Sequence, residues 1–326
     1  MTLTVIGAGA WGTALARLLA QNGHRVVLWG HDPGCLEEIR RTGRNDRYLP
    51  GIELPRELNL ETDLKHAVAG ADGVVIAVPS KAFREVTSSL GDFNGIAASV
   101  TKGVEYETGL TMSGVLKQTW PHAQVGALSG PTLAMEVAQG IPAAIVAAHD
   151  NEEGARKLQA FFHSATFRVY TSTDLLGVEL GGALKNVIAI AAGMSDGLGF
   201  GDNSKAALVT RGIVEIRRLG VACGAQPETF SGLSGLGDLA VTCFSRLSRN
   251  RGLGEKLGRG ENIDEILVRT VTVAEGYPTA RSAMHLARRM KVETPIIDAV
   301  YAVLYEKKPV PQALHDLMSR DTKPED

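Results

Sequence analysis

A glycine-rich turn near the N-terminus constrains the fold of this chain more than any other feature. Gly7-Ala-Gly-Ala-Trp-Gly12 follows the apolar run 3–6 and opens a helical pattern over Trp11–Asn22. In such a strand–turn–helix unit, Gly7 allows the tight turn, Gly9 lets the backbone approach a pyrophosphate, and Gly12 lets the helix pack closely on the strand. The helix N-terminus adds N–H donors and positive potential. The motif and its position therefore predict a dinucleotide-binding site.

The pattern of the whole chain predicts two domains. Short β-rich apolar runs alternate with helical patterns at Leu3–Ile6, Val26–Trp29, Val74–Val78, Ala98–Thr101, Val125–Ser129, Ala144–Ala148 and Phe167–Tyr170. This alternation indicates an α/β fold with a Rossmann-type, doubly wound, largely parallel sheet. Helical patterns alone follow at Asp174–Gly193, Lys205–Leu219, Thr279–Arg289, Thr294–Tyr305 and Gln312–Ser319. We expect a dinucleotide-binding domain over residues 1–177 and an all-helical, substrate-binding domain over residues 178–326.

Composition narrows the function classes. The chain has 326 residues, 44% of them hydrophobic, and a net charge of -2, which suits two globular domains and argues against nucleic acid as the main partner. Cys35, Cys223 and Cys243 share no metal-ligand or redox spacing, so we expect reduced thiols in a cytosolic protein and no metal site. The N-terminus shows no targeting pattern, and no uncharged apolar run reaches membrane-spanning length. We therefore expect a cytoplasmic protein without stable membrane insertion.

The end of the second expected strand leaves the cofactor preference open. Val26–Trp29 is followed by Gly30-His31-Asp32, whereas NAD-binding folds usually place an acidic residue at the strand end, where it binds the ribose 2′-hydroxyl. His31 stands where a 2′-phosphate would lie, unless it is an ordinary loop residue. NADP should therefore be tolerated, and Asp32 keeps NAD possible.

Lys185 is the strongest catalytic candidate. It lies in the apolar run 178–193, where Glu179 is the only other charged residue. Helical spacing surrounds Lys185 with small and apolar side chains, so desolvation would lower its pKa and let it exchange protons near neutral pH. The structural alternative is a lysine that pairs with Glu179 or extends to the surface.

Four further segments carry polar groups suited to a small anion. Thr101-Lys102-Gly103 follows one strand and Leu128-Ser-Gly-Pro-Thr132 follows another, where it is expected to start a helix. Lys102 is either a ligand contact or a solvated loop lysine. Gly232-Leu-Ser-Gly-Leu-Gly-Asp-Leu239 suggests a tightly bent backbone that fixes Asp238. Ser245-Arg-Leu-Ser-Arg-Asn-Arg251 would suit a phosphate, although it could be a solvated basic turn.

Together these features indicate hydride transfer on a small phosphorylated alcohol or ketone. The ordered motifs resemble the bacterial NAD(P)-dependent glycerol-3-phosphate dehydrogenases over nearly the whole chain. The resemblance rests on Gly7–Gly12, Thr101–Gly103, Ser129–Thr132, Leu180–Val187, Gly193–Gly201, Gly235–Asp238 and Ser248–Asn250. Many members carry arginine after the second strand, where this chain has His31-Asp32.

The resemblance implies roles for individual residues. Lys185 would be the proton donor and acceptor, with Asp238 as its catalytic partner. The substrate would bind to Lys102, Gly130, Thr132, Lys185, Asp238, Ser248, Arg249 and Asn250. NAD or NADP would bind to Gly7, Gly9, Ala10, Trp11, Gly12, His31, Lys102, Ala134, Arg249, Val273 and Glu275. The family is typically dimeric and cytoplasmic and supplies sn-glycerol 3-phosphate for phospholipid synthesis, which makes dihydroxyacetone phosphate the expected substrate.

Two other functions remain open at this point. One is a two-domain Rossmann dehydrogenase that acts on a hydroxy acid. The other is a non-catalytic redox sensor that binds a dinucleotide and signals through the helical domain. The sensor gives no reason for a desolvated lysine beside a cluster of arginines.

Overall fold

The computed structural model describes residues 1–269, 274–322 and 324, and its chain divides into two compact units. The sheet unit comprises Met1–Glu105 and Leu110–Glu179, and the helical unit comprises Tyr106–Gly109 and Leu180–Asp326. Tyr106–Gly109 joins the helical unit although its neighbours in sequence do not. The guanidinium of Arg281 lies 3.4 Å from the Tyr106 ring, and Arg289 donates to the Thr108 carbonyl.

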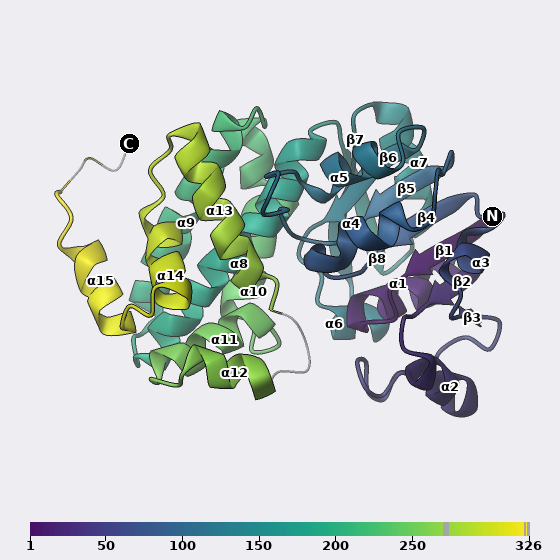
Figure 1. Ribbon diagram of the computed structural model, residues 1–326, viewed down its shortest axis with the longest axis horizontal. Coiled ribbons are helices and arrows are strands. Elements are labelled where there is room, and N and C mark those ends of the chain that lie inside the picture. The colour runs from purple at the N-terminus through teal and green to yellow at the C-terminus, as the bar shows by residue number, and fades with distance from the viewer. Residues whose placement is uncertain (270–273, 323, 325–326) are drawn as a thin grey trace. The chain divides into compact units, whose positions relative to one another are not determined.

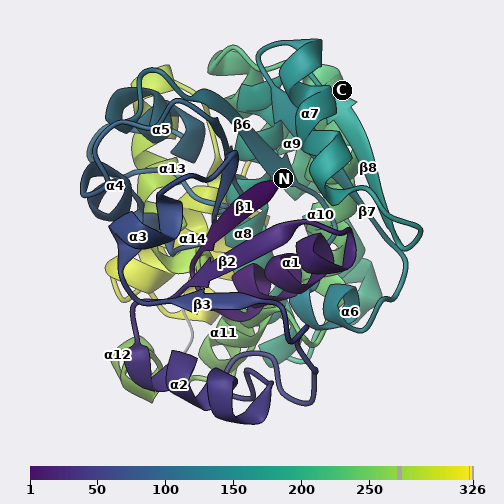
Figure 2. The ribbon, with the colours of Figure 1, turned by 90° about the vertical axis from the view of Figure 1, so that its right-hand side faces the viewer.

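The sheet unit holds one eight-stranded sheet of order β3-β2-β1-β4-β5-β6-β7-β8, which Figures 1 and 2 show as a twisted array. Neighbouring strands run parallel except for the antiparallel pair β6–β7. The expected largely parallel sheet is confirmed. Its strands are β1 (Thr2–Ile6), β2 (Arg25–Trp29), β3 (Asn59–Glu61), β4 (Gly73–Ile76), β5 (Ile96–Ser99), β6 (Gln124–Ser129), β7 (Ala143–His149) and β8 (Phe167–Ser172).

Strand β3 is the one strand of the described sheet that the sequence analysis missed, because three residues are too few for a period-two pattern. Strands β4 and β5 end two residues earlier than expected, at Ile76 and Ser99. As a result, Val78 and Thr101 lie in the loops beyond the carboxyl ends of their strands. Ligands commonly bind at this edge of an open α/β sheet.

Helices cover both faces of the sheet because successive side chains of a strand point to opposite sides. Leu3 and Val5 pack into one core cluster, whereas Ile6 packs into a second. The first cluster includes side chains from α1 (Ala10–Gln21), α2 (Pro33–Thr42) and α7 (Glu152–Phe162), and the second from α3 (Leu64–Val68), α4 (Ser80–Ser88) and α5 (Met112–Thr119). The sheet is therefore doubly wound, as expected.

The helical unit is built around the part of α8 (Leu175–Gly197) that follows Glu179, in which Leu180–Ile190 is buried throughout. Around it lie α9 (Asp202–Ala222), a 3₁₀ turn at Pro227–Ser231, a π-helical turn at Leu233–Gly237, α10 (Asp238–Phe244), α11 (Arg249–Gly258), α12 (Ile263–Arg269), α13 (Gly276–Met290), α14 (Pro295–Tyr305) and α15 (Val310–Met318). Figure 1 shows these elements in green to yellow. Among the described residues of this unit there is no strand, as the sequence predicted.

Helix α8 is the single described helix long and apolar enough to cross a membrane. Its most apolar window is 89% buried within the protein, and the helix contains three charged residues, Glu179, Lys185 and Asp196. These properties are typical of the central helix of a helical core.

Candidate active site

The glycine-rich turn has the geometry of a pyrophosphate cradle. Gly7 has φ +121°, and a Cβ atom there would lie 2.8 Å from the Ala77 carbonyl oxygen. A Cβ atom on Gly12 would lie 1.9 Å from the Gly7 oxygen, whereas one on Gly9 would meet nothing within 4 Å. Helix α1 begins at Ala10 and Trp11 and has no acidic residue in its first turn. Its N-terminus and the open space over Gly9 therefore suit an anion.

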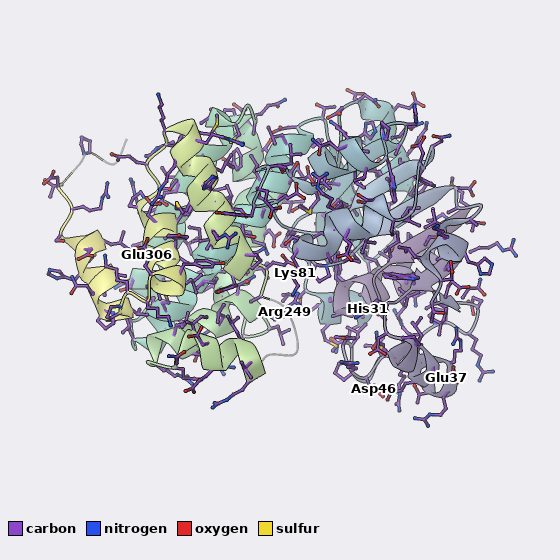
Figure 3. All side chains as sticks on the ribbon, viewed as in Figure 1. His31, Glu37, Asp46, Lys81, Arg249 and Glu306 are labelled. Carbon is purple, nitrogen blue, oxygen red and sulfur yellow. The ribbon has the colours of Figure 1, made fainter. Side chains whose placement is uncertain are left out.

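The end of β2 offers little to a ribose hydroxyl. One oxygen of Asp32 caps α2 by accepting from the Gly34 and Cys35 amides, and the other lies 2.7 Å from Arg47 Nη1. These donors hold the pKa of the Asp32 carboxyl below its usual value, the Cys35 amide most strongly. His31 follows β2 and precedes α2 in the chain and is exposed; Figure 3 labels it. Both carboxylate oxygens of Asp32 therefore already have partners within the protein. This arrangement favours binding of a cofactor with a 2′-phosphate over recognition of a ribose 2′-hydroxyl by Asp32.

Lys102 and Gly130 come together in the sheet unit. Lys102 Nζ donates to the Gly130 carbonyl at 3.0 Å, and the Thr132 hydroxyl donates to the same oxygen at 3.1 Å. Lys102 is only partly exposed and is therefore not a fully solvated loop lysine. The helix expected to start at Thr132 is the single turn α6 (Ala134–Ala138), because Pro131 and the extended Leu133 precede it. Ala134 is its first residue.

Lys185 forms a buried ion pair in the helical unit. Its Nζ lies 2.7 Å from Asp238 Oδ1 and donates to the Thr242 hydroxyl at 2.6 Å. The side chains of Lys185 and Asp238 are 7% and 2% exposed. Of the two structural alternatives, pairing with Glu179 is wrong, because the Glu179 carboxylate accepts hydrogen bonds from Ser113 while Lys185 pairs with Asp238.

A wide helical turn positions Asp238. The expected bend consists of a π-helical turn over residues 233–237, closed by a bond from the Gly237 amide to the Gly232 carbonyl, and α10 continues directly from it. Such turns often mark functional sites. A Cβ atom on Gly235 would lie 2.1 Å from the Phe230 oxygen, and one on Gly181 would lie 2.7 Å from the Ser234 oxygen. Gly181 therefore lets the turn pack directly on α8, and Gly235 lets it lie directly against the backbone of Phe230.

The three arginines of 245–251 have different surroundings. Arg251 forms ion pairs with Asp196 and Glu255, so it is not a phosphate ligand in this conformation. Arg246 is exposed. Arg249 is also exposed, at the first position of α11, and Figure 3 labels it there. Desolvation by neighbouring atoms lowers the pKa of the Arg249 guanidinium, and Glu275 opposes this shift.

Ser248 and Asn250 organise the start of two helices. The Ser248 hydroxyl caps α11 by accepting from the Arg251 amide. Asn250 donates to Asn186 Oδ1 at 2.8 Å and accepts from the Gly276 amide at 2.9 Å. Glu275 is the residue before α13. Val273, another expected cofactor contact, lies outside the described residues.

Two polar residues at the site escaped the sequence analysis. Thr242 donates to the Asp238 carbonyl, and Asn186 binds Asn250. Sequence signals existed for both, because Thr242 follows Asp238 by four residues on a helix and Asn186 adjoins Lys185. A hydroxyl inside a helix is nevertheless common, so neither signal was specific.

Both units are similar to known proteins. A family model described as the NAD-dependent glycerol-3-phosphate dehydrogenase N-terminus matches residues 2–155, and the corresponding C-terminus model matches residues 174–315. A protein from Chlorobium phaeobacteroides (strain BS1) named glycerol-3-phosphate dehydrogenase [NAD(P)+] is 48% identical over 100% of this chain and 99% of its own length. A protein of the same name from Geobacter sp. (strain M21) is 48% identical over 99% of this chain and 98% of its own.

Solved structures give the same result. Glycerol-3-phosphate dehydrogenase from Coxiella burnetii aligns with a TM-score of 0.94 and 38% identity, covering 98% of this chain and 99% of its own. The enzyme from Saccharomyces cerevisiae aligns with a TM-score of 0.82 and 29% identity, covering 98% and 99%. The chain therefore belongs to the NAD-dependent glycerol-3-phosphate dehydrogenase family.

Proposed function

We propose that this protein reduces dihydroxyacetone phosphate to sn-glycerol 3-phosphate with NAD(P)H, in a reversible reaction. The observation that carries the proposal is the buried pair of Lys185 and Asp238, in a chain whose two units both match the family models. A lysine held by a carboxylate and a hydroxyl away from bulk water is suited to proton transfer at one fixed position.

The glycine-rich turn fits the proposed cofactor. The open space over Gly9 and the N-terminus of α1 would receive the pyrophosphate, with Gly7, Ala10, Trp11 and Gly12 forming the turn. We assign further cofactor contacts to His31, Lys102, Ala134, Arg249, Val273 and Glu275 on the family resemblance. When bound, NAD(P)H supplies the hydride that the protein itself lacks.

Lys185 would handle the proton. In the reducing direction its ammonium donates a proton to the substrate carbonyl oxygen as that oxygen gains negative charge. Asp238 Oδ1 and the Thr242 hydroxyl hold Nζ in place, and the carboxylate favours return of a proton to the amine. In the oxidising direction the same nitrogen would accept the proton.

Arg249 would bind the phosphate of the substrate. Arg249 is an exposed residue at the N-terminus of α11, where helix N–H groups also favour an anion. Ser248 and Asn250 position this turn, and an amide side chain has a second N–H to offer beyond the bond to Asn186. Lys102, Gly130 and Thr132 of the sheet unit complete the proposed substrate contacts.

The proposal extends to the protein in the cell. We assign the dinucleotide-binding domain to residues 1–177 and the helical, substrate-binding domain to residues 178–326, although single residues of each domain are proposed to contact the other ligand. We also propose a cytoplasmic homodimer that supplies sn-glycerol 3-phosphate for phospholipid synthesis, on the family resemblance alone.

The experiment that tests this proposal is an absorbance assay of reduced nicotinamide consumption. Dihydroxyacetone phosphate, a 2-keto acid such as pyruvate, and no substrate are compared with NADPH and with NADH. We expect turnover with dihydroxyacetone phosphate alone. Turnover with the keto acid would favour the hydroxy-acid dehydrogenase, and dinucleotide binding without any turnover would favour the sensor.

A further inference from the structure

Helices α8 and α11 cross at unusually close range. A Cβ atom added to Gly193 would lie 1.9 Å from the Arg251 carbonyl oxygen, and one added to Gly254 would lie 1.9 Å from the Ile190 oxygen. Backbone therefore lies directly on backbone at this crossing. Glycines remove the side-chain ridges that normally fix how one helix sits on another, so other groups must set the rotation of α11.

Polar contacts on both sides of the crossing supply that constraint. Toward the N-terminus of α8, Asn250 donates to Asn186. Toward its C-terminus, Arg251 Nη2 lies 2.6 Å from Asp196 Oδ2, and Arg251 Nη1 lies 3.2 Å from Glu255. The other oxygen of Asp196 lies 2.6 Å from Lys205 Nζ on α9.

The charged cluster of Asp196, Lys205 and Arg251 is largely buried. A contribution to stability is not a sufficient reason for its presence. The side chains of Asp196, Lys205 and Arg251 are each 11% exposed. Removing charges from water costs about as much as their attraction returns, so buried ion pairs are often replaceable by apolar residues without loss of stability. Such pairs can instead fix one arrangement among several that pack equally well.

The rotation of α11 determines the position of Arg249. Arg249 is two positions before Arg251, at the start of the same helix, so a rotation of α11 moves its guanidinium directly. We propose that Asp196, acting through Arg251, is a positioning residue that sets the rotation of α11 and so places Arg249 for the substrate phosphate. This inference rests on the proposed function, and it adds two residues to the substrate site that do not touch the substrate.

The test uses a variant that removes the contact without leaving a buried charge unpaired. In Asp196→Leu/Lys205→Met, Arg251 keeps Glu255 as its partner while its link to α8 is lost. Lys205→Met alone is the matched control, because it removes a buried lysine but leaves Asp196 paired with Arg251. Arg251→Lys is a second variant that keeps the charge but cannot reach both carboxylates as a guanidinium fork does. The melting temperature of each protein checks that it is folded.

Steady-state kinetics then distinguish a misplaced Arg249 from a general loss of structure. In the double variant and in Arg251→Lys we expect the KM for dihydroxyacetone phosphate to rise about tenfold, with the KM for NADPH and the kcat within about twofold of wild type. The slow reaction of unphosphorylated dihydroxyacetone and the Lys205→Met control should stay near wild type.

Two outcomes would overturn the inference. One is an unchanged KM for dihydroxyacetone phosphate in both test variants. The other is an equal loss with the phosphorylated and unphosphorylated ketones. A wild type without activity on dihydroxyacetone phosphate would instead refute the proposed function, and the inference with it.

Discussion

At the scale of single residues, the proposed function depends most on Lys185. Lys185→Ala should lower kcat by roughly a hundredfold to ten-thousandfold, because the proposed proton donor at the carbonyl oxygen is lost. Lys185→Arg should be almost as poor, since a guanidinium does not release its proton near neutral pH. Dinucleotide affinity, measured by fluorescence titration, should be unchanged in both.

Lys205→Met is the natural control for Lys185→Ala, because Lys205 is also a buried lysine paired with an aspartate. It should keep most of the wild-type kcat. Wild-type rates in Lys185→Ala, or an equal loss in Lys205→Met, would remove Lys185 from the mechanism.

Arg249 should act through the substrate phosphate. Arg249→Ala and Arg249→Lys should each lower kcat/KM for dihydroxyacetone phosphate by at least about tenfold, because lysine keeps the charge but loses the bidentate fork. The reaction of dihydroxyacetone should hardly change. If kcat/KM falls equally for both ketones, Arg249 serves the cofactor or the fold instead.

His31 should influence the choice between NADP and NAD. A carboxylate at this exposed position would repel a 2′-phosphate, so His31→Asp should lower the ratio of kcat/KM for NADPH to that for NADH, by about tenfold. His31→Asn is the uncharged control. Gly30 is a poor place for this test, because a Cβ atom there would lie 3.0 Å from the Ala8 methyl group. A ratio that His31→Asp leaves unchanged would show that the 2′-position lies elsewhere.

At the scale of elements, a buried carboxylate of α9 binds the N-terminus of α14 and should make the stability of the protein depend on pH. Glu215 of α9 accepts hydrogen bonds from the Ile296 and Ile297 amides. Burial raises the pKa of Glu215 from 4.5 to about 7, with Asp298 adding to the rise and the two amides and Arg218 opposing it. Between these two values the folded protein binds a proton that the unfolded chain does not, so the free energy of unfolding should fall as the pH rises.

The measurement is urea unfolding of wild type and Glu215→Gln at about pH 5 and about pH 7, a window over which one such group contributes up to about 2 to 3 kcal/mol. Glutamine keeps an acceptor for the α14 amides and does not titrate. The wild type should therefore lose more stability than Glu215→Gln. Parallel behaviour of the two proteins would show that Glu215 titrates normally.

At the scale of the whole molecule, the sequence predicted the architecture well and the detailed contacts poorly. The apolar runs predicted the central strands β4 and β5 because both faces of these strands are buried, which favours small and apolar residues throughout. The glycine spacing predicted the turn before α1, because its geometry tolerates little else. Those signals are local in sequence.

The contacts at the site depend on helix packing, which a single sequence does not reveal. Nothing near Lys185 in sequence identified Asp238 as its partner, because 53 positions separate them. Likewise, the basic run ending at Arg251 does not show that Arg251 turns inward to Asp196 while Arg249 remains exposed. The family resemblance supplied roles for these residues that the residue pattern could not.

The most direct test of the account compares two ketones with the wild-type protein. We measure kcat/KM for dihydroxyacetone phosphate and for dihydroxyacetone, with NADPH, from the consumption of reduced nicotinamide. Binding energy from the phosphate should align the carbonyl with Lys185, so the account predicts a preference of roughly a thousandfold or more for the phosphorylated ketone. Comparable values for the two ketones, or no turnover of either, would contradict it.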